Sequence, residues 1–260
     1  MLRIAVTVKQ VPKGDALMDN KTGLLIRKEL STNPYDYFAI ESALRLKDKF
    51  DCTIDLFSLC PKVDNSAFTE YYSLGVDNCY HISDIAFKGA DVLATAKAIS
   101  EAIKLKGPYD LILTGRNTTD GDTSAVGSSI AAFLNIPSVM YVKEILDIVD
   151  NKVILTHELT SYIEKLSCNM PAVFAIDKDT VTCRIPSLTA KLKAKKKEAS
   201  IITLSDLKDC EKIHFGEQGS RTKVVKIYEE VPLKKGVEIS GDISSLSEFI
   251  INKTKDIKSW

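Results

Sequence analysis

The sequence predicts an α/β fold in which a mostly parallel, doubly wound sheet carries helices on both faces. Runs rich in Val and Ile alternate with stretches of helical period from residue 2 to residue 142. Parallel strands need crossover connections, which are usually helices, so this alternation is typical of a parallel sheet. The chain has 260 residues, 45% of them hydrophobic, which is enough to bury the core of one large domain or of a domain with an extension.

The elements of this sheet follow one another at short intervals. The predicted strands are Leu2 to Val8, Thr53 to Leu59, Cys79 to Ile82, Tyr109 to Thr114 and Ser138 to Val142. The predicted helices are Tyr35 to Phe50, Asp64 to Leu74, Ala90 to Leu105 and Gly121 to Leu134. Asn33-Pro34 is a start signal for the first helix, and Gly75 is a stop signal for the second.

The pattern changes after residue 142. Ile145 to Val149 and Lys152 to Leu159 predict a hairpin around Asp150-Asn151, and Ala172 to Ile176 predicts a further strand of the same sheet. From Arg184 the chain is basic and weakly periodic until a short helix predicted over Ile243 to Lys253. We therefore expect an α/β domain over residues 1–183, a basic segment over 184–200 and a C-terminal arm over 201–260 that packs on a partner.

Charge and composition exclude several classes of protein. Thirty-five basic side chains balance 35 acidic ones, so no overall field favours nucleic acid or a membrane surface. The N-terminus lacks a signal peptide, and no apolar run approaches the roughly 20 residues of a spanning helix, so we expect a cytoplasmic protein. The six cysteines form no C-x-x-C pair, and we assign no metal site.

Ligands of a doubly wound sheet bind beyond the carboxyl ends of its strands, where the strand order reverses. The loops after the first and fourth strands are therefore the candidate site. The loop after the fourth strand reads GRNTTDGDTSAVG from Gly115 to Gly127, with neither a Walker A lysine nor a G-x-G-x-x-G pattern. We expect its glycines to permit close backbone approach and Asp122, Thr123 or Ser124 to cap the next helix.

Three interpretations of Asp120 and Asp122 remain open from local sequence. They could hold a divalent cation, although such sites usually recruit more carboxylates. They could be turn and capping residues that need no ligand. They could also shape a nucleotide pocket in which phosphates rest on backbone amides. The loop alone does not choose among them.

Six segments together resemble the beta subunits of electron transfer flavoproteins. They read VTVKQVP, NPYDYFAIESALRLK, FKGADVLATAKAI, GRNTTDGDTSAVG, RIPSLTAKLKAKKKE and GEQGSRTKVV, and they span nearly the whole chain in order. The resemblance implies a Rossmann-like adenine-nucleotide-binding domain and a heterodimer with an FAD-bearing alpha subunit.

The same resemblance implies which residues bind the cofactor. They are Thr7, Val8, Lys9, Asn33, Pro34, Asp36, Leu59, Thr95, Gly115, Arg116, Asp120, Gly121, Asp122, Thr123, Ser124, Ala125 and Val126. The phosphates are expected against main-chain donors from Gly121 to Val126. No side chain is assigned as a catalytic acid or base, because hydride and electron chemistry belongs to the cofactor.

The nucleotide itself is either FAD or AMP. One branch of the family carries D-D-x-x-N-Q-T-G and holds a structural AMP; the other carries D-G-D-T-A-Q-V-G, and many of its members hold a second FAD that takes hydride from NADH and bifurcates electrons toward ferredoxin. The segment DGDTSAVG resembles the second branch, so we favour FAD and electron bifurcation, with non-bifurcating AMP binding as the alternative.

The basic segment resembles the family's recognition loop for a partner flavin dehydrogenase of the acyl-CoA or hydroxy-acid type. Leu188 matches the leucine that inserts into that partner, and the lysines after it flank the contact. Without the resemblance, a solvated basic stretch is the simpler interpretation. A stand-alone adenine-nucleotide sensor is the third functional hypothesis.

Overall fold

The computed structural model describes residues 1–13, 17–18, 25–26, 30–61, 65–209, 211–223, 225 and 238–254. The chain forms two compact units, Met1–Lys223 and Val224–Trp260. In the second unit the structure describes α7 (Ile243–Thr254), which matches the helix predicted there. The Asp242 carboxylate accepts a hydrogen bond from the Ser245 backbone at 2.8 Å and so caps this helix.

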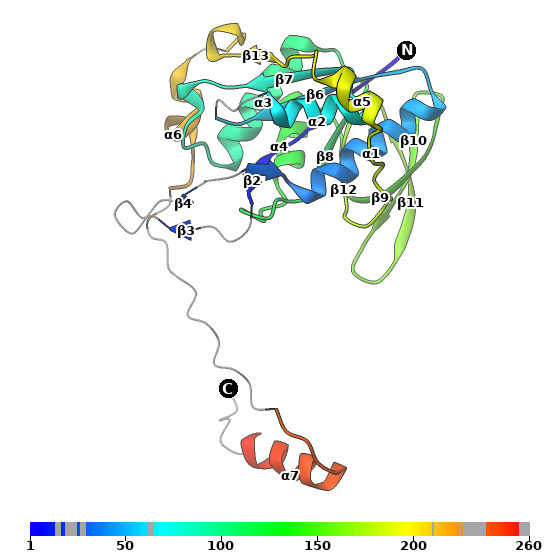
Figure 1. The fold of residues 1–260 in the computed structure, drawn as a ribbon, viewed down its shortest axis with the longest axis vertical. Coiled ribbons are helices and arrows are strands. Elements are labelled where there is room, and N and C mark those ends of the chain that lie inside the picture. The colour runs from blue at the N-terminus through cyan, green and yellow to red at the C-terminus, as the bar shows by residue number, and fades with distance from the viewer. Residues whose placement is uncertain are drawn as a thin grey trace. The chain divides into compact units, whose positions relative to one another are not determined.

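The first unit is built on a nine-stranded sheet in the order β11-β10-β9-β12-β8-β1-β6-β7-β13 (Figure 1). Its strands are β1 (Leu2–Thr7), β6 (Cys52–Leu59), β7 (Asn78–Ile82), β8 (Leu111–Gly115), β9 (Ser138–Val149), β10 (Lys152–Glu158), β11 (Ile163–Asn169), β12 (Ala172–Ile176) and β13 (Ser200–Ile202). In this spatial order, every pairing between neighbours from β9 through β12, β8, β1, β6 and β7 to β13 is parallel. At the other end of the sheet, β10 runs antiparallel to β9 and β11. The predicted mostly parallel sheet is confirmed.

Two pairs of helices cover the two faces of this sheet (Figure 1). Helices α1 (Pro34–Lys49) and α2 (Ser66–Leu74) pack on one face, and α3 (Val92–Lys106) and α4 (Val126–Leu134) on the other. Successive side chains of a strand point to opposite faces, so Ile4 and Val6 of β1 contact the first pair while Ala5 between them contacts the second. The sheet therefore has a hydrophobic core on each of its two faces.

Shorter elements complete the first unit. Two small antiparallel ladders join β2 (Gln10–Pro12) to β5 (Leu30–Thr32) and β3 (Leu17–Met18) to β4 (Leu25–Ile26). The single-turn segments are η1 (Ile85–Phe87), η2 (Leu204–Asp206), η3 (Lys212–His214) and α6 (Gly216–Gly219), and α5 spans Leu188–Ala194. None of the described helices is long and apolar enough to cross a membrane.

Helix α4 starts later than predicted, at Val126 instead of Gly121. Asp122 and Ser124 have φ angles of 44° and 50°, so the backbone turns through the left-handed region before the helix begins. This is also why none of the predicted capping residues caps α4: its N-cap is Ala125, and no side chain makes a cap hydrogen bond. The start of the second predicted helix, Asp64, lies outside the described residues.

The region after residue 142 differs from the prediction in two ways. The strands expected at Ser138 to Val142 and Ile145 to Val149 are one strand, β9, which turns at Tyr141, a residue with a φ of 55°. The hairpin to β10 is present. Residues 201–223, expected in the C-terminal arm, belong to the first compact unit, because β13 pairs with β7 and Phe215 is 1% exposed in the core.

Candidate functional site

The strand order reverses beside β1. The chain adds β6 and β7 on one side of β1 and then returns to place β8 on the other, with Val6 of β1 opposite Leu113 of β8. The carboxyl ends of β1 and β8 are therefore neighbours, and the loops that leave them are the two that the sequence singled out.

A buried carboxylate joins these two loops. Asp36, in the first turn of α1 and 4% exposed, accepts a hydrogen bond at 2.7 Å from the Lys9 backbone N–H and one at 3.0 Å from Nδ2 of Asn33. Burial raises the pKa of Asp36 to about 7, although the N–H groups of Lys9 and Gly115 and the Asn33 amide oppose the shift. Donors thus surround a carboxylate whose ionisation is costly.

Asn33 ties the same helix start to the loop after β8. This side chain is fully buried, and its Nδ2 also donates to the Asn117 carbonyl at 2.9 Å. Its Oδ1 accepts from the Thr119 backbone N–H at 3.3 Å. One amide therefore holds the loop by both of its polar atoms, so the position of the loop depends on the start of α1.

The three glycines of the loop differ in how closely other atoms approach them. A Cβ at Gly115 would lie 2.2 Å from Oδ1 of Asp36, and a Cβ at Gly127 would lie 2.8 Å from Oγ1 of Thr114. These two glycines therefore permit close approach by the protein's own side chains. At Gly121 such a Cβ would lie 3.6 Å from Oγ1 of Thr118, which is ordinary van der Waals contact, so that position alone among the three could accept a Cβ without a clash.

Both aspartates of the DGD segment hold the loop. Asp120 Oδ1 lies 2.7 Å from Nζ of Lys9, so a lysine from the loop after β1 reaches the loop after β8. Asp122 accepts a hydrogen bond from the Asn117 amide. No group of three or more His, Cys, Asp or Glu side chains among the described residues could hold a metal ion, so the divalent-cation interpretation finds no ligand set there.

The start of α4 fits an anionic group of a ligand. Its first backbone N–H groups lack a side-chain cap, and such groups attract anions together with the positive end of the helix dipole. Three buried side-chain atoms at the end of β8 also have no hydrogen-bond partner: Oγ1 of Thr114, Nε of Arg116 and Oδ1 of Asn117. Buried polar atoms are normally paired, so this group suits a polar ligand at the site.

Arg116 forms one border of the site. Its guanidinium lies 5.7 Å from the Tyr35 ring centroid and 5.4 Å from that of Tyr141, and its Nη1 is 2.8 Å from Oδ1 of Asp177. The sequence did not single out Tyr141 or Asp177. Asp177 could have been found, because it is a charged residue directly after a strand that neighbours β8.

The remaining predicted residues divide between the core and the sheet edge. Thr7 and Val8 are buried, whereas Pro34 is exposed at the start of α1. Leu59 ends β6 and is half-buried, and Thr95 lies in the first turn of α3, on a different element from the loop. The residues from Thr123 to Val126 form the approach to α4. The structure thus brings the loops after β1 and β8 together with the start of α1.

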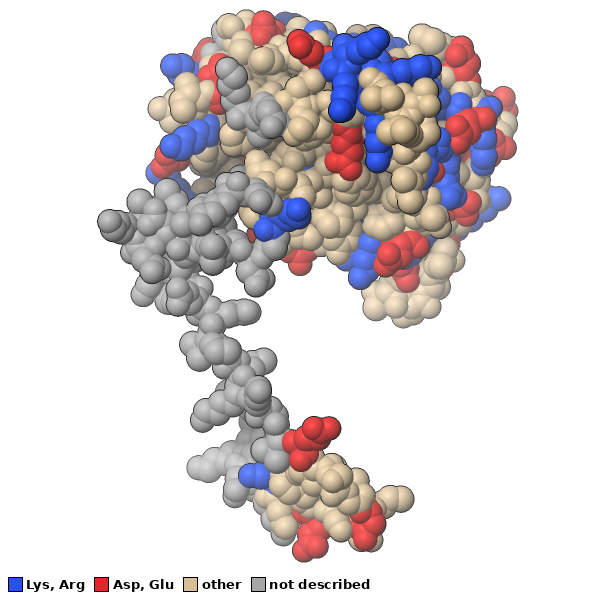
Figure 2. Space-filling model, in the orientation of Figure 1, with Lys and Arg blue, Asp and Glu red and all other residues tan. Residues whose placement is uncertain are grey.

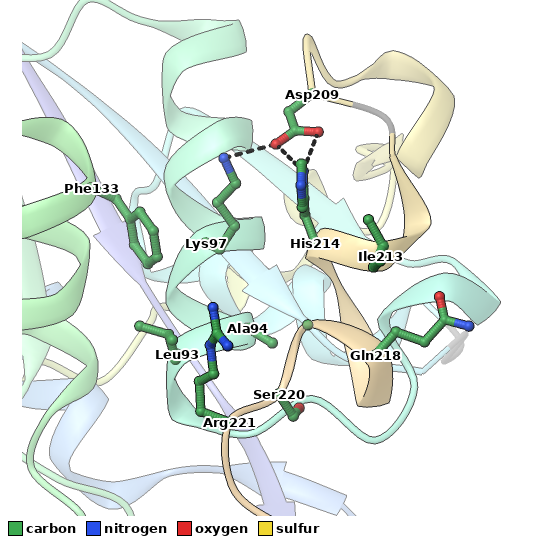
Figure 3. A pocket seen from close by; sticks show the side chains of 11 residues that line it. Leu93, Ala94, Lys97, Phe133, Asp209, Ile213, His214, Gln218, Ser220 and Arg221 are labelled. Carbon is green, nitrogen blue, oxygen red and sulfur yellow. Dashed lines mark hydrogen bonds and ion pairs between the residues drawn. The ribbon is translucent and has the colours of Figure 1, made fainter.

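A separate hollow of about 550 Å³ lies between α3, α4 and the segment after residue 208 (Figure 3). Within its lining, Asp209 lies 2.9 Å from Nζ of Lys97 and 2.9 Å from Nδ1 of His214. None of the predicted cofactor-binding residues lines it.

A basic surface surrounds α5, where Figure 2 shows lysines gathered over the segment. Leu188, the first residue of α5, is 74% exposed. Arg184 fastens the segment before the helix through Glu41, with Nε 3.0 Å from Oε2. After the helix, the Tyr72 hydroxyl donates to the Glu198 carbonyl at 2.9 Å. The lysines are Lys191, Lys193, Lys195, Lys196 and Lys197, all exposed. We call this the α5 surface.

The strand order and the uncapped α4 define a doubly wound α/β protein with an uncapped helix start at its switch point. Residues 23–207 match the family model described as electron transfer flavoprotein domain. The chain is similar to the electron transfer flavoprotein subunit beta of Thermoanaerobacterium thermosaccharolyticum (34% identity; 97% of each chain) and of Clostridium acetobutylicum (31%; 98% of each). It is also similar to the caffeyl-CoA reductase-Etf complex subunit CarD of Acetobacterium woodii (32%; 98% of each). The chain belongs to the electron transfer flavoprotein beta subunit family.

Proposed function

We propose that this chain binds FAD at the loop after β8 and acts as the beta subunit of a bifurcating electron transfer flavoprotein. The observation that carries the proposal is the uncapped start of α4, which lies behind a left-handed loop at the switch point of the sheet. Such a helix start offers backbone donors to a phosphate without a lysine of the Walker type.

Within this proposal the chain's residues bind and position. The backbone from Gly121 to Val126 receives the phosphates, and Asp120 and Asp122 keep the loop in place through Lys9 and Asn117. Arg116 borders the site between two tyrosine rings. Bound FAD would supply hydride and electron transfer, chemistry that no side chain of the chain provides.

The choice of FAD over AMP rests on the sequence DGDTSAVG, which resembles the bifurcating branch. NADH as hydride donor and ferredoxin as one acceptor belong to this proposal, as does an alpha subunit that carries a second FAD. The two relatives are beta subunits by name, which supports such a heterodimer.

We further propose that the α5 surface docks a flavin dehydrogenase. An exposed leucine on a segment fastened at both ends can present a defined apolar contact, while exposed lysines mainly govern the rate of encounter. The unit after Lys223 is proposed to pack on the alpha subunit, because Ile243, Ile250 and Ile251 of α7 are all exposed by more than half.

The test is to co-purify the beta chain with its alpha subunit, denature the complex and quantify released FAD and AMP. Two FAD per heterodimer support the proposal. One FAD with one AMP rejects bifurcation and leaves the non-bifurcating alternative. A beta chain that forms a stable homodimer with adenine nucleotide and no flavin would instead support the stand-alone sensor.

A further inference from the structure

The carboxylate of Asp36 lies where three segments meet: the loop after β1, the start of α1 and the end of β8. Its oxygens receive the Lys9 N–H at 2.7 Å and the Asn33 amide at 3.0 Å, and Gly115 approaches so closely that any Cβ there would overlap Oδ1. Asp36 thus sits beneath the loop that leaves β8. Its side chain is occupied by the protein itself.

We propose that Asp36 is a positioning residue whose ionised carboxylate latches the loop after β1 to the loop after β8, and that nucleotide binding requires this latch. The inference rests on the proposed function, since it concerns the same loop. It assigns Asp36 a role without contact to the nucleotide, unlike the amides from Gly121 to Val126.

The chemistry of the neighbours explains why the charge matters. Every group described above as bonded to the Asp36 oxygens is a donor: the N–H groups of Lys9 and Gly115 and the Asn33 amide. A carboxylate accepts from all of them, whereas a protonated carboxyl must place its own hydrogen among donors. Hydrogen bonds to charged groups are roughly twice as strong as those between neutral groups.

The strength of this contact between the two loops should therefore depend on the protonation of Asp36. The charged and titratable groups that act on it come from two further elements. Lys9 lowers the pKa of Asp36 and is itself paired with Asp120; the Tyr71 hydroxyl of α2 has a pKa raised by burial and, to a smaller extent, by Asp36. Burial outweighs these influences and raises the pKa of Asp36 to about 7. Because the nucleotide requires the ionised form, affinity should fall as pH drops below this value.

The experiment compares Asp36→Asn with a matched control, Glu41→Gln, in the co-purified complex after removal of its nucleotide. Both carboxyl groups lie on α1 and are 4% and 5% exposed, and each substitution replaces a carboxyl group by an amide. Glu41 differs in its partners, because it pairs with Arg45 and Arg184, away from both loops. The probe is AMP, the portion common to both candidate ligands, titrated by calorimetry. We expect Asp36→Asn to raise the Kd for AMP roughly tenfold or more and Glu41→Gln to change it less than about twofold.

Two readouts separate positioning from general stability. The wild-type Kd should rise more steeply than that of Asp36→Asn as pH falls from 8 to 6; the phosphate of AMP, which titrates near pH 6, is common to both proteins. Hydrogen exchange of peptides containing Lys9 and Gly115 should accelerate in Asp36→Asn and not in Glu41→Gln. If Asp36→Asn does not fold, Asn33→Ala removes the bridging amide and should give the same exchange pattern.

An unchanged Kd and an unchanged pH profile in Asp36→Asn would overturn the inference while leaving nucleotide binding intact. A wild-type complex that binds neither AMP nor FAD would overturn the proposed function as well. The two failures are therefore distinguishable by the wild-type titration alone.

Discussion

The switch-point loop and the α5 surface hold their functional side chains in opposite ways. In the first, Asn33 and Asp36 are buried and bond to backbone from separate segments. In the second, Leu188 is 74% exposed on a segment that is fastened before and after the helix. A cross-linked loop suits a ligand that stays bound, whereas an exposed leucine among lysines suits a partner that docks and leaves.

The largest effect on nucleotide affinity should come from adding a side chain at Gly115, which lies against Asp36. In Gly115→Ala the new Cβ would lie 2.2 Å from Oδ1 of Asp36 and 3.0 Å from the Tyr35 carbonyl carbon, so the loop must move. Overpacking of this kind costs about 1–3 kcal/mol, and we expect roughly a hundredfold weaker nucleotide binding. Thermal unfolding with Gly121→Ala as control checks the stability change, since a Cβ there has no neighbour nearer than 3.6 Å.

The second effect is on the pH dependence of stability. The pKa of Asp36 is raised from 3.8 to about 7, so the folded protein holds a proton that the unfolded chain releases. The contribution of Asp36 to the free energy of unfolding is fully present below about pH 4 and is lost as pH rises to 7. Denaturant unfolding at several pH values gives the free energy of unfolding as a function of pH. Between about pH 4 and 7 this free energy should fall more steeply for the wild type than for Asp36→Asn, by at most about 1.4 kcal/mol per pH unit. Equal slopes would contradict the shift.

The third effect distinguishes the two regions directly. Leu188→Ala should slow electron delivery to the partner dehydrogenase about tenfold, as expected for an apolar anchor, and leave the nucleotide content unchanged. Leu105→Ala, an exposed leucine on α3, is the control. Stopped-flow reduction of the dehydrogenase gives the rates. Loss of nucleotide in Leu188→Ala would show that the regions are not independent.

The smallest effect concerns the lysines of the α5 surface. Replacing Lys191 and Lys193 by Gln should lower the association rate two- to threefold, by about the amount expected of rim charges, and should flatten its dependence on salt. Association rates measured at several ionic strengths test this. An unchanged salt slope would argue that these lysines do not face the partner.

Much of the sheet follows from the sequence because its signals are local. Runs rich in Val and Ile, the Asn33-Pro34 start and the Gly75 stop predicted strands β1, β6, β7 and β8 and the presence of helices α1 to α4. The left-handed residues Asp122 and Ser124 were missed, since aspartate and serine also suit helix caps. That ambiguity moved the predicted start of α4 by several residues.

The interior of the site could not be predicted from local pattern. Lys9 and Asp120 are 111 residues apart in the chain, and Asn33 reaches Asn117 across 84. Likewise, a proximity of Gly115 to Asp36 exists only once α1 packs beside β8. The family resemblance assigned these residues to one site. Only the packing shows which of them contact one another.

The return of the chain to the sheet after α5 has one more consequence. Because β13 pairs with β7 and Phe215 is buried beyond it, the docking segment is a loop closed at both ends. A protease that nicks the chain once among the lysines of α5 would therefore leave two fragments interlocked through the core. On the proposed function, the cut molecule would keep its nucleotide and lose the docking that we propose for the α5 surface.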